Sequence, residues 1–437
     1  MLKIGYIGLG CRGKGMLKTV LDSFKDVEIV GVCDVYEDRV QEGLDIIKDK
    51  RGTTAFGTTN SDEIMKMDVD AVMVMTSWEA HIPLCIAAMK AGKPVAMEVG
   101  GAYSIEDCYA LVRTSEETGV PCMLLENCCY GKRELAVLKM VREGVFGDVV
   151  HCSGGYFHDL RPEISFGEIR RHYRLRNYKS RNCENYPTHE LGPIAKVLNI
   201  NRGNRMIQLT SVASRAAGLK AYIEKTADML YETLAEDEGK EVKVADKTFS
   251  VTQELCDKYV ASNEGPVAQG DIVNTIITCA DGSTILLTLD TTLPRAYSRG
   301  FTVRGTKAAY FEDNNSMFID DDEDAMKNHF RWHTMWGNGD KYIQENLHPL
   351  WQKYAEDARN AGHDGMDYMV LRAFFEAVEK KAQFPIDVYD AASWMCITAL
   401  SEQSIAMGGA PVAIPDFTTG KWAMYKKQDT GLEFSLD

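Results

Sequence analysis

A short pattern near the start of the chain constrains its fold more than any other feature. An apolar run over residues 4–7 leads directly into the turn GLGCRG at residues 8–13, and a helical pattern follows. A second apolar run over residues 27–33 then ends at Asp34, about twenty residues after the last glycine of the turn. A strand, a G-x-G-x-x-G turn, a helix and an acid in this order are typical of a dinucleotide-binding βαβ unit. The pattern therefore predicts such a unit here.

Each residue of this pattern has a mechanical role. Gly8 permits the tight turn, Gly10 lets a pyrophosphate approach the backbone, and Gly13 lets the helix pack against the strand. The N-terminus of that helix attracts the phosphates. A carboxylate at Asp34 accepts hydrogen bonds from the ribose hydroxyls of NAD and repels the additional phosphate of NADP. The two residues that follow are uncharged, although Arg39 lies nearby, so the sequence favours NAD.

Length and composition exclude several classes of protein. With 437 residues the chain is long enough for two domains. A formal net charge of -15 argues against a nucleic-acid partner, because such partners require basic patches. No apolar run reaches the roughly 18 residues of a membrane helix, and the first predicted strand begins almost at Met1, which argues against a secretory leader. The cysteines then indicate reduced thiols in a cytoplasmic protein, and their spacing predicts no metal site.

Residues 1–127 alternate between strand and helix patterns, which predicts a parallel sheet with helices on both faces. The predicted strands cover residues 3–9, 27–33, 69–76, 94–99 and 121–127. Predicted helices between them include residues 81–91 and 104–118. Ligands of such sheets bind at the carboxyl ends of the strands. The residues at these ends are Gly8, Asp34, Ser77, Glu98 and Asn127.

The pattern changes after residue 127. A helix is predicted over residues 132–143, and the longer strands that follow cover residues 149–158, 206–214, 271–279, 283–291 and 301–303. Asp281-Gly282 between two alternating runs is typical of a hairpin. We therefore expect residues 128–437 to form a separate α+β domain with an open, largely antiparallel sheet. Within it, residues 220–265 form a charged surface insertion, and amphipathic helices are expected over residues 364–380 and 389–406.

Long motifs throughout the chain resemble those of one enzyme family. They include GLGCRG at residues 8–13, SWEAHIPLC at 77–85, LLENCCYG at 124–131, NYPTHELGP at 185–193 and AGHDGMDYMVL at 361–371. The two-domain order resembles the Gfo/Idh/MocA oxidoreductase superfamily. The motifs resemble glycoside hydrolase family 109 within it, the NAD-dependent α-N-acetylgalactosaminidase-like branch. Only the insertion at residues 220–265 matches poorly.

The resemblance implies roles for residues of both predicted domains. The residues implied to contact NAD, beside the three glycines, are Cys11, Arg12, Asp34, Ser77, Trp78, His81, Glu98, Val99, Asn127 and Arg174. Those implied to bind a small glycoside are Tyr156, Arg174, Tyr186, Pro187, Thr188, His189 and Tyr297. Dehydrogenases of the superfamily commonly carry a lysine directly after the acid that ends the fifth strand. This chain has Glu98-Val99-Gly100 there, which favours the hydrolase branch.

Three positions depart from the usual sequence of this branch. Gly100 replaces a proline, Glu190 replaces a glycine beside His189, and Leu289 replaces a histidine. We expect Glu190 to place a carboxylate beside the imidazole of His189 and to raise its pKa. The departures leave the reaction class in place but open the question of which sugar and aglycone are accepted.

Residue chemistry selects two catalytic candidates. Histidine titrates closest to neutral pH, so His189 is the first candidate for moving protons. The alternative is a histidine that only supports the site. Tyr156 and Tyr297 have an ordinary pKa near 10 and serve more readily as hydrogen-bond donors to sugar hydroxyls. The resemblance makes Tyr297 the second catalytic candidate.

The resemblance also implies an unusual reaction. NAD-dependent glycosidases are exceptions to the mechanism with two carboxylates. Cleavage would proceed by transient oxidation at the third ring carbon, elimination of the aglycone, addition of water and re-reduction, without net redox change. The alternatives are an NAD-dependent sugar or inositol dehydrogenase and a non-enzymatic NAD-binding sensor. Since one face of the open sheet needs cover, the sequence further predicts a homo-oligomer.

Overall fold

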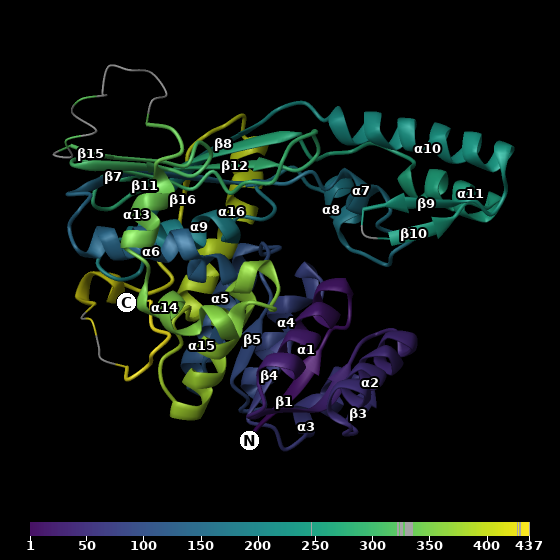
Figure 1. Cartoon of the computed structure of the whole chain (residues 1–437), viewed down its shortest axis with the longest axis horizontal. Coiled ribbons are helices and arrows are strands. Elements are labelled where there is room, and N and C mark those ends of the chain that lie inside the picture. Colours follow the sequence, from purple (N-terminus) through teal and green to yellow (C-terminus); the bar gives the residue numbers. More distant parts are fainter. Residues whose placement is uncertain are drawn as a thin grey trace.

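The computed structural model describes residues 1–245, 247–320, 323, 327, 335–425, 427 and 430–436. Figure 1 shows two layers built around separate sheets. The first sheet lies in the lower part, in purple and blue, and the second crosses the upper part, in teal and green. This architecture confirms the predicted fold class, a Rossmann domain followed by an α+β domain with an open sheet.

The first sheet is parallel, with the strand order β3-β2-β1-β4-β5-β6. Its strands are β1 (Leu2–Ile7), β2 (Val27–Cys33), β3 (Phe56–Thr58), β4 (Ala71–Val74), β5 (Val95–Met97) and β6 (Cys122–Leu124). The helices between them are α1 (Cys11–Ser23), α2 (Glu37–Arg51), α3 (Ser61–Lys66), α4 (Trp78–Lys90) and α5 (Ile105–Thr118). The strand order reverses between β1 and β4, and such a switch point opens a crevice for a ligand beyond the strand ends.

Several predicted boundaries in this sheet shift in the structure. Helix α4 begins at Trp78, three residues before the predicted start, because Ser77 is the extended residue that precedes the helix. The predicted start of α5 is confirmed: the side chain of Ser104 accepts a hydrogen bond from the amide of Asp107 at 3.1 Å. Strand β3 was not predicted, since three residues are too few for a recognisable alternation.

The second sheet has the order β15-β14-β13-β7-β12-β11-β8-β16, in which only β7 and β12 run parallel. Its strands are β7 (Val149–Phe157), β8 (Met206–Ala213), β11 (Ile272–Cys279), β12 (Thr284–Asp290), β13 (Thr302–Gly305), β14 (Ala308–Phe311), β15 (Ser316–Ile319) and β16 (Val412–Ala413). Strands β11 and β12 form the predicted hairpin around Asp281-Gly282. The inner face packs on α9 (Thr188–Val197), whereas Val150, Val212 and Ile276 stay about half exposed on other positions of the sheet.

The predicted insertion forms a small unit beside the second sheet, on the right of Figure 1. It contains α10 (Gly218–Glu236), the hairpin of β9 (Glu241–Val244) and β10 (Lys247–Ser250), and α11 (Gln253–Asn263). These elements bury a hydrophobic cluster of their own, to which Phe166 contributes from outside the insertion. Phe166 follows α7 (Arg161–Ser165), so the insertion packs directly on the segment that leads to α8 (Arg174–Ser180).

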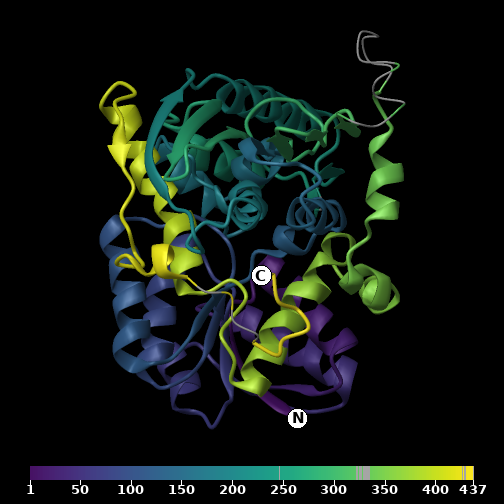
Figure 2. The ribbon, with the colours of Figure 1, turned by 90° about the vertical axis from the view of Figure 1, so that its left-hand side faces the viewer.

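The last third of the chain returns to the first sheet. Its elements include α13 (Gly339–Glu345), α14 (Pro349–Ala358), η2 (His363–Gly365), α15 (Met366–Lys380), α16 (Val388–Ala406) and η3 (Lys421–Met424). Helix α15 packs against α1 and against η1 (Asn127–Tyr130), which lies just before α6 (Lys132–Arg142). Helix α16, in yellow in Figure 2, runs along both layers and contacts α5, β6 and β8. The division at residue 127 stays a prediction, and helices from beyond it cover the first sheet.

Two further observations bear on the predicted class of protein. Among the described residues, no helix combines the length and the apolarity that crossing a membrane requires. All twelve cysteines are free thiols, and all but Cys11 are buried.

Candidate active site

The glycine-rich turn has the shape that a dinucleotide requires. Gly8 has a φ of +104°, and a Cβ there would lie 2.4 Å from the carbonyl oxygen of Met75. A Cβ at Gly13 would lie 2.2 Å from the carbonyl oxygen of Gly8, so both positions accept only glycine. At Gly10, by contrast, the nearest atom is Arg39 Nη1 at 3.9 Å. The turn is therefore closed on the sheet side and open at Gly10, where α1 begins and a pyrophosphate would bind.

Asp34 lies at the end of β2, next to this turn. It is 7% exposed, and its Oδ2 accepts a hydrogen bond from the amide of Leu9 at 2.7 Å. Its Oδ1 accepts one from the amide of Tyr36 at 3.1 Å, and Arg39 Nη1 lies 3.9 Å from Oδ2. Each carboxylate oxygen has lone pairs left for a ribose hydroxyl. Asp34 thus fixes the turn and lies where the sequence predicts the residue that reads the ribose.

We expect Asp34→Ala to weaken NAD binding by about 10- to 100-fold, the worth of a charge-assisted hydrogen bond, and to affect NADP binding far less. The reason is that the carboxylate favours the ribose hydroxyls of NAD and repels the phosphate of NADP. Titration calorimetry with both cofactors measures the two affinities. An equal loss for NAD and NADP would mean that Asp34 acts through the Leu9 amide, as a support of the turn.

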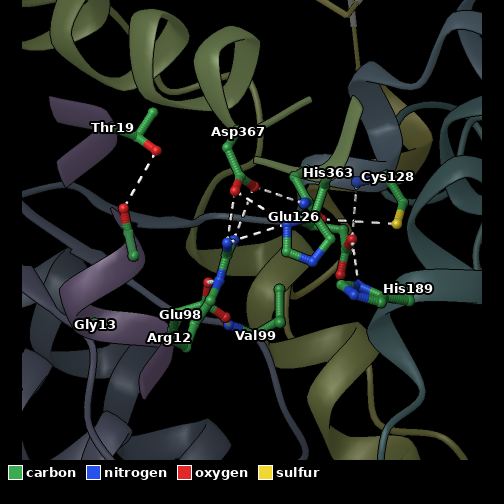
Figure 3. A network of polar contacts seen from close by, with 12 residues as sticks. Arg12, Gly13, Thr19, Glu98, Val99, Glu126, Cys128, His189, His363 and Asp367 are labelled. Atoms are coloured by element: carbon green, nitrogen blue, oxygen red, sulfur yellow. Dashed lines mark hydrogen bonds and ion pairs between the residues drawn. The ribbon is translucent and has the colours of Figure 1, made fainter. Parts of the chain in front are cut away.

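A network of charged groups lies beside the turn, and Figure 3 shows it from close by. Arg12 donates from Nε to Glu98 at 2.7 Å and from Nη1 and Nη2 to the two carboxylate oxygens of Asp367 at 2.6 and 2.8 Å. Asn127 also donates to Asp367, at 2.8 Å, and His363 Nδ1 lies 3.0 Å from it. The structure thus brings together the predicted residues Arg12, Glu98 and Asn127. The group at the centre, Asp367, was not predicted.

Burial and charge set the protonation state of this network. Burial alone would raise the pKa of Asp367, but the hydrogen bonds from Arg12 and His363 outweigh it and hold that pKa well below its usual range. The carboxylates in turn raise the pKa of Arg12 above its usual value, although burial opposes the charge. Asp367 is therefore an anion at neutral pH that holds the Arg12 guanidinium at the start of α1.

A second polar pair lies next to this network. Glu126, two residues after the end of β6, is fully buried, and its Oε1 lies 2.8 Å from Nδ1 of His189 at the start of α9. Burial alone would raise the pKa of Glu126, but the charge and hydrogen bond of His189 outweigh it and lower that pKa. The carboxylate orients the imidazole through Nδ1, and Nε2 is the ring nitrogen that Glu126 does not contact. Glu126 was not predicted, although its position before Asn127 at a strand end was a usable signal.

Aromatic rings and one arginine form a wall beside His189. The ring of Tyr186 lies 4.4 Å from Tyr156 and 4.9 Å from His189, between centroids. Arg174, the first residue of α8, lies 5.0 Å above the rings of both Trp78 and Tyr186. Burial raises the pKa of the Tyr156 and Tyr186 phenols, so both are neutral donors at pH 7. Tyr156 and Tyr186 flank the imidazole, and Trp78 and Arg174 extend the wall beyond Tyr186. All four residues were predicted, and their flat surfaces and donors suit a sugar ring.

The remaining predicted residues occupy the edges of this region. Pro187 directly precedes α9, and Thr188 is the first residue of that helix, next to His189. Val99 donates its amide to Glu98 Oε2 at 2.8 Å. His81 is buried, its Nε2 lies 3.0 Å from the carbonyl of Thr76, and burial lowers its pKa to about 4. Tyr297 is 51% exposed, and its ring packs edge-on against His158, which in turn contacts Tyr156. Tyr297 therefore lies at the outer end of this aromatic row.

The three sequence departures have different structural consequences. Gly100 has a φ of +151°, and a Cβ there would lie 2.2 Å from Trp78, so the exchange of proline for glycine brings the indole against the backbone. Leu289 pairs with Tyr156 across β12 and β7 and is buried. Glu190 faces Gly154 rather than the ring of His189, and burial together with Glu184 raises its pKa well above its usual range. The carboxylate that contacts His189 is thus that of Glu126, and the prediction that Glu190 is its partner is wrong.

Ligand atoms of Glu126, Cys128 and His189 lie within 4.8 Å of one another, and all three residues are buried. Arg299 Nη1 lies 3.7 Å from the Cys128 sulfur, and burial raises the pKa of that thiol well above its usual value. A cation beside a protonated thiol opposes binding of a second positive charge. The chemistry of the group therefore favours proton handling by Glu126 and His189. The predicted absence of a metal stays a prediction.

Comparisons with known proteins agree with this geometry. Residues 130–236 and 248–424 match the model of the glycosyl hydrolase 109 C-terminal domain, and residues 2–125 match the oxidoreductase family with an NAD-binding Rossmann fold. The chain is 36% identical to an α-N-acetylgalactosaminidase of Tannerella forsythia, over 97% of this chain and 87% of the relative. It is 37% identical to a glycosyl hydrolase family 109 protein of Stenotrophomonas maltophilia, over 97% and 91%. A levoglucosan dehydrogenase in complex with NADH and L-sorbose shares the fold, with a TM-score of 0.64, 17% identity, and 96% and 100% coverage.

Proposed function

Because the chain belongs to glycosyl hydrolase family 109, we propose that it is a glycosidase that keeps NAD as a resident cofactor and cleaves a glycoside of N-acetylgalactosamine or a related sugar. The observation that carries the proposal is that two polar networks meet at the consecutive residues Glu126 and Asn127. Asn127 belongs to the Arg12–Asp367 network beside the glycine turn, and Glu126 pairs with His189 beside the aromatic wall. The junction joins a cofactor site to a group that handles protons.

The residues present fit NAD. The turn is open at Gly10, and Asp34 follows β2 beside it. Glu98, which follows β5 at the same edge of the sheet, accepts a hydrogen bond from Arg12 at the start of α1. Bound NAD would supply a transient hydride acceptor for the third ring carbon, so that cleavage leaves no net redox change. The chain has Val99 where related dehydrogenases carry a lysine, so the proton at the oxidised hydroxyl needs another acceptor.

We assign that proton transfer to His189. Its Nδ1 is held by the Glu126 carboxylate at 2.8 Å, which fixes the orientation of the ring. Once an adjacent ketone acidifies the hydrogen of the second ring carbon, a base of modest strength is sufficient to remove it. Tyr297 stays the second candidate, as a donor to the leaving oxygen, because a phenol has an ordinary pKa near 10 and partial burial raises the pKa of Tyr297 further. Its outer position suits the aglycone.

The remaining wall would bind the sugar. Arg174 carries a fixed positive charge, and its Nε pairs with Glu163 at 2.8 Å, so its position is set before a ligand arrives. Arg174 lies over Trp78 and Tyr186, the rings that would contact the sugar. The neutral phenols of Tyr156 and Tyr186 would donate hydrogen bonds to ring hydroxyls.

Incubation with p-nitrophenyl glycosides in deuterated water tests the function. Release of nitrophenol without stoichiometric NADH, and with deuterium at the second ring carbon of the product, supports the proposed route. Release without deuterium would leave a glycosidase but exclude elimination. Steady accumulation of NADH from free sugars, without cleavage, would contradict the proposal and favour the alternative, an NAD-dependent sugar or inositol dehydrogenase.

We also propose that the protein is a homo-oligomer. The apolar side chains of Val212 and Ile276 lie on the same face of the neighbouring strands β8 and β11, and each is 53% exposed. A sheet face with such residues is usually covered by a partner. Light scattering at micromolar concentration should give a mass of at least twice that of the chain, and Ile276→Lys should reduce it. A monomer under these conditions would contradict the proposal.

The buried free thiols further suit a cytoplasmic location.

A further inference from the structure

A segment between α7 and α8 crosses from the second domain to the cofactor side of the first. Residues 166–173, here called the crossing segment, end directly before Arg174 of the sugar-binding wall. Arg39 of α2 donates from Nη2 to the carbonyl oxygens of Arg170 and Arg171, at 3.2 and 3.1 Å. Arg171 donates to both carboxylate oxygens of Asp38 at 2.9 and 2.7 Å. Two consecutive residues of α2 therefore hold the crossing segment.

These contacts lie over the adenosine end of the proposed cofactor site. Arg39 Nη1 is 3.9 Å from Asp34 Oδ2 and 3.9 Å from the Cβ position of Gly10, so its guanidinium borders the expected place of the ribose and phosphates. Tyr36, two residues after Asp34, has the guanidinium carbons of Arg39 and Arg171 at 4.8 and 4.4 Å from its ring centre. The backbone of the crossing segment, the ion pair of Arg171 with Asp38 and the ring of Tyr36 thus close one side of the expected ribose position.

The crossing segment is firm enough to hold such a position. The amide of His172 donates a hydrogen bond to the carbonyl of Gly167 at 2.7 Å. The amide of Arg170 donates one to the carbonyl of Phe166 at 2.9 Å. Phe166 is fully buried in the core of the insertion, where its ring lies 4.7 Å from that of Tyr259. Arg171 adopts a φ of +53°, a conformation that non-glycine residues rarely adopt, so the backbone is bent to present its side chain to Asp38.

We propose that Asp38, Arg39 and Arg171 form a clasp that positions and retains the adenosine half of NAD. The clasp rests on the proposed cofactor site but not on the proposed reaction. A redox-neutral cycle never requires exchange of the cofactor, so slow release carries no penalty for turnover. Because Arg171 and Arg174 are three residues apart on one firm segment, the clasp also ties the cofactor side to the sugar-binding wall. The insertion, through Phe166, supports both.

The clasp is tested by the rate at which labelled NAD leaves the loaded protein when unlabelled NAD is added in excess. We expect Arg171→Ala and Asp38→Asn each to increase this rate about three- to tenfold, as suits a bidentate but partly exposed ion pair. The double variant should release NAD no faster than the single ones, because both remove the same contact. Raising the salt concentration to about 0.5 M should bring the wild-type rate toward that of the variants.

Asp22→Asn is the matched control, because Asp22 pairs with Lys50 at the other end of α2, away from the clasp. Its release rate should equal that of the wild type. Circular dichroism melting shows that each variant is folded. Unchanged release in both clasp variants, or an equal change in the control, would overturn the clasp. Clasp variants that release NAD faster in a protein without glycosidase activity would leave the clasp intact and overturn the proposed function alone. A folded chain that binds no NAD would overturn both.

Discussion

His189→Ala should lower the turnover number by about 10²–10⁴, the usual worth of a positioned acid or base. The imidazole is held by Glu126 at 2.8 Å and lies against Tyr156 and Tyr186, so the variant removes an oriented proton carrier. NAD affinity should change little, because the glycine turn and Asp34 are on the other side of the Arg12–Asp367 network. Steady-state kinetics on a p-nitrophenyl glycoside and calorimetry with NAD separate the two effects.

His151→Ala is the matched control for this variant. His151 is also a histidine of the second domain, but its Nδ1 contacts Thr284 at 2.9 Å, and the ring lies on β7 away from the aromatic wall. Its turnover should match the wild type. Glu126→Gln should reproduce part of the loss in His189→Ala, because the ring then lacks the carboxylate that orients it. A higher KM with unchanged turnover in His189→Ala would instead make His189 a binding residue and Tyr297 the proton carrier.

The sequence predicted those parts of the fold and site that local patterns determine. The alternation of strands and helices and the glycine turn place Gly8, Asp34, Glu98 and Asn127 at one edge of a sheet, because parallel strands end together. Glu126 was missed, although a carboxylate next to Asn127 at the end of the last predicted strand is the same kind of signal. Helix α8 was missed because seven residues are too few to show a period.

The remaining part of the site depends on contacts between distant segments. Asp367 follows Asn127 by 240 positions, and only the docking of α15 on α1 and η1 places it against Arg12. Glu190 shows the opposite case: it is adjacent to His189 in sequence, but the turn of α9 directs it to Gly154. Neighbours in a helix point about 100° apart, so adjacency in sequence is a poor guide to which carboxylate contacts an imidazole.

Asp367→Asn should destabilise the protein by about 1.5–3 kcal/mol at pH 7, the range for hydrogen bonds to a charged group, because the Arg12 side chain is 34% exposed. Asp367 is 1% exposed and receives two hydrogen bonds from Arg12 and one from Asn127, so the amide leaves the guanidinium with a single carboxylate, Glu98. Urea unfolding monitored by fluorescence measures the change. Arg12→Met in the same chain should recover part of the loss, because no buried charge is then left unpaired.

The dependence of this difference on pH identifies its origin. The pKa of Asp367 in the folded protein is held well below its unfolded value of about 3.9 by Arg12 and His363, against the effect of burial. A lowered pKa contributes stability that is complete above the unfolded value and is lost as the pH falls toward the folded one. The difference in the free energy of unfolding between wild type and Asp367→Asn should therefore stay constant from about pH 7 to 5 and become smaller below about pH 4. A difference that persists undiminished in acid would mean that Asp367 stabilises the fold through its shape and neutral hydrogen bonds, and that the charge of Arg12 is compensated elsewhere.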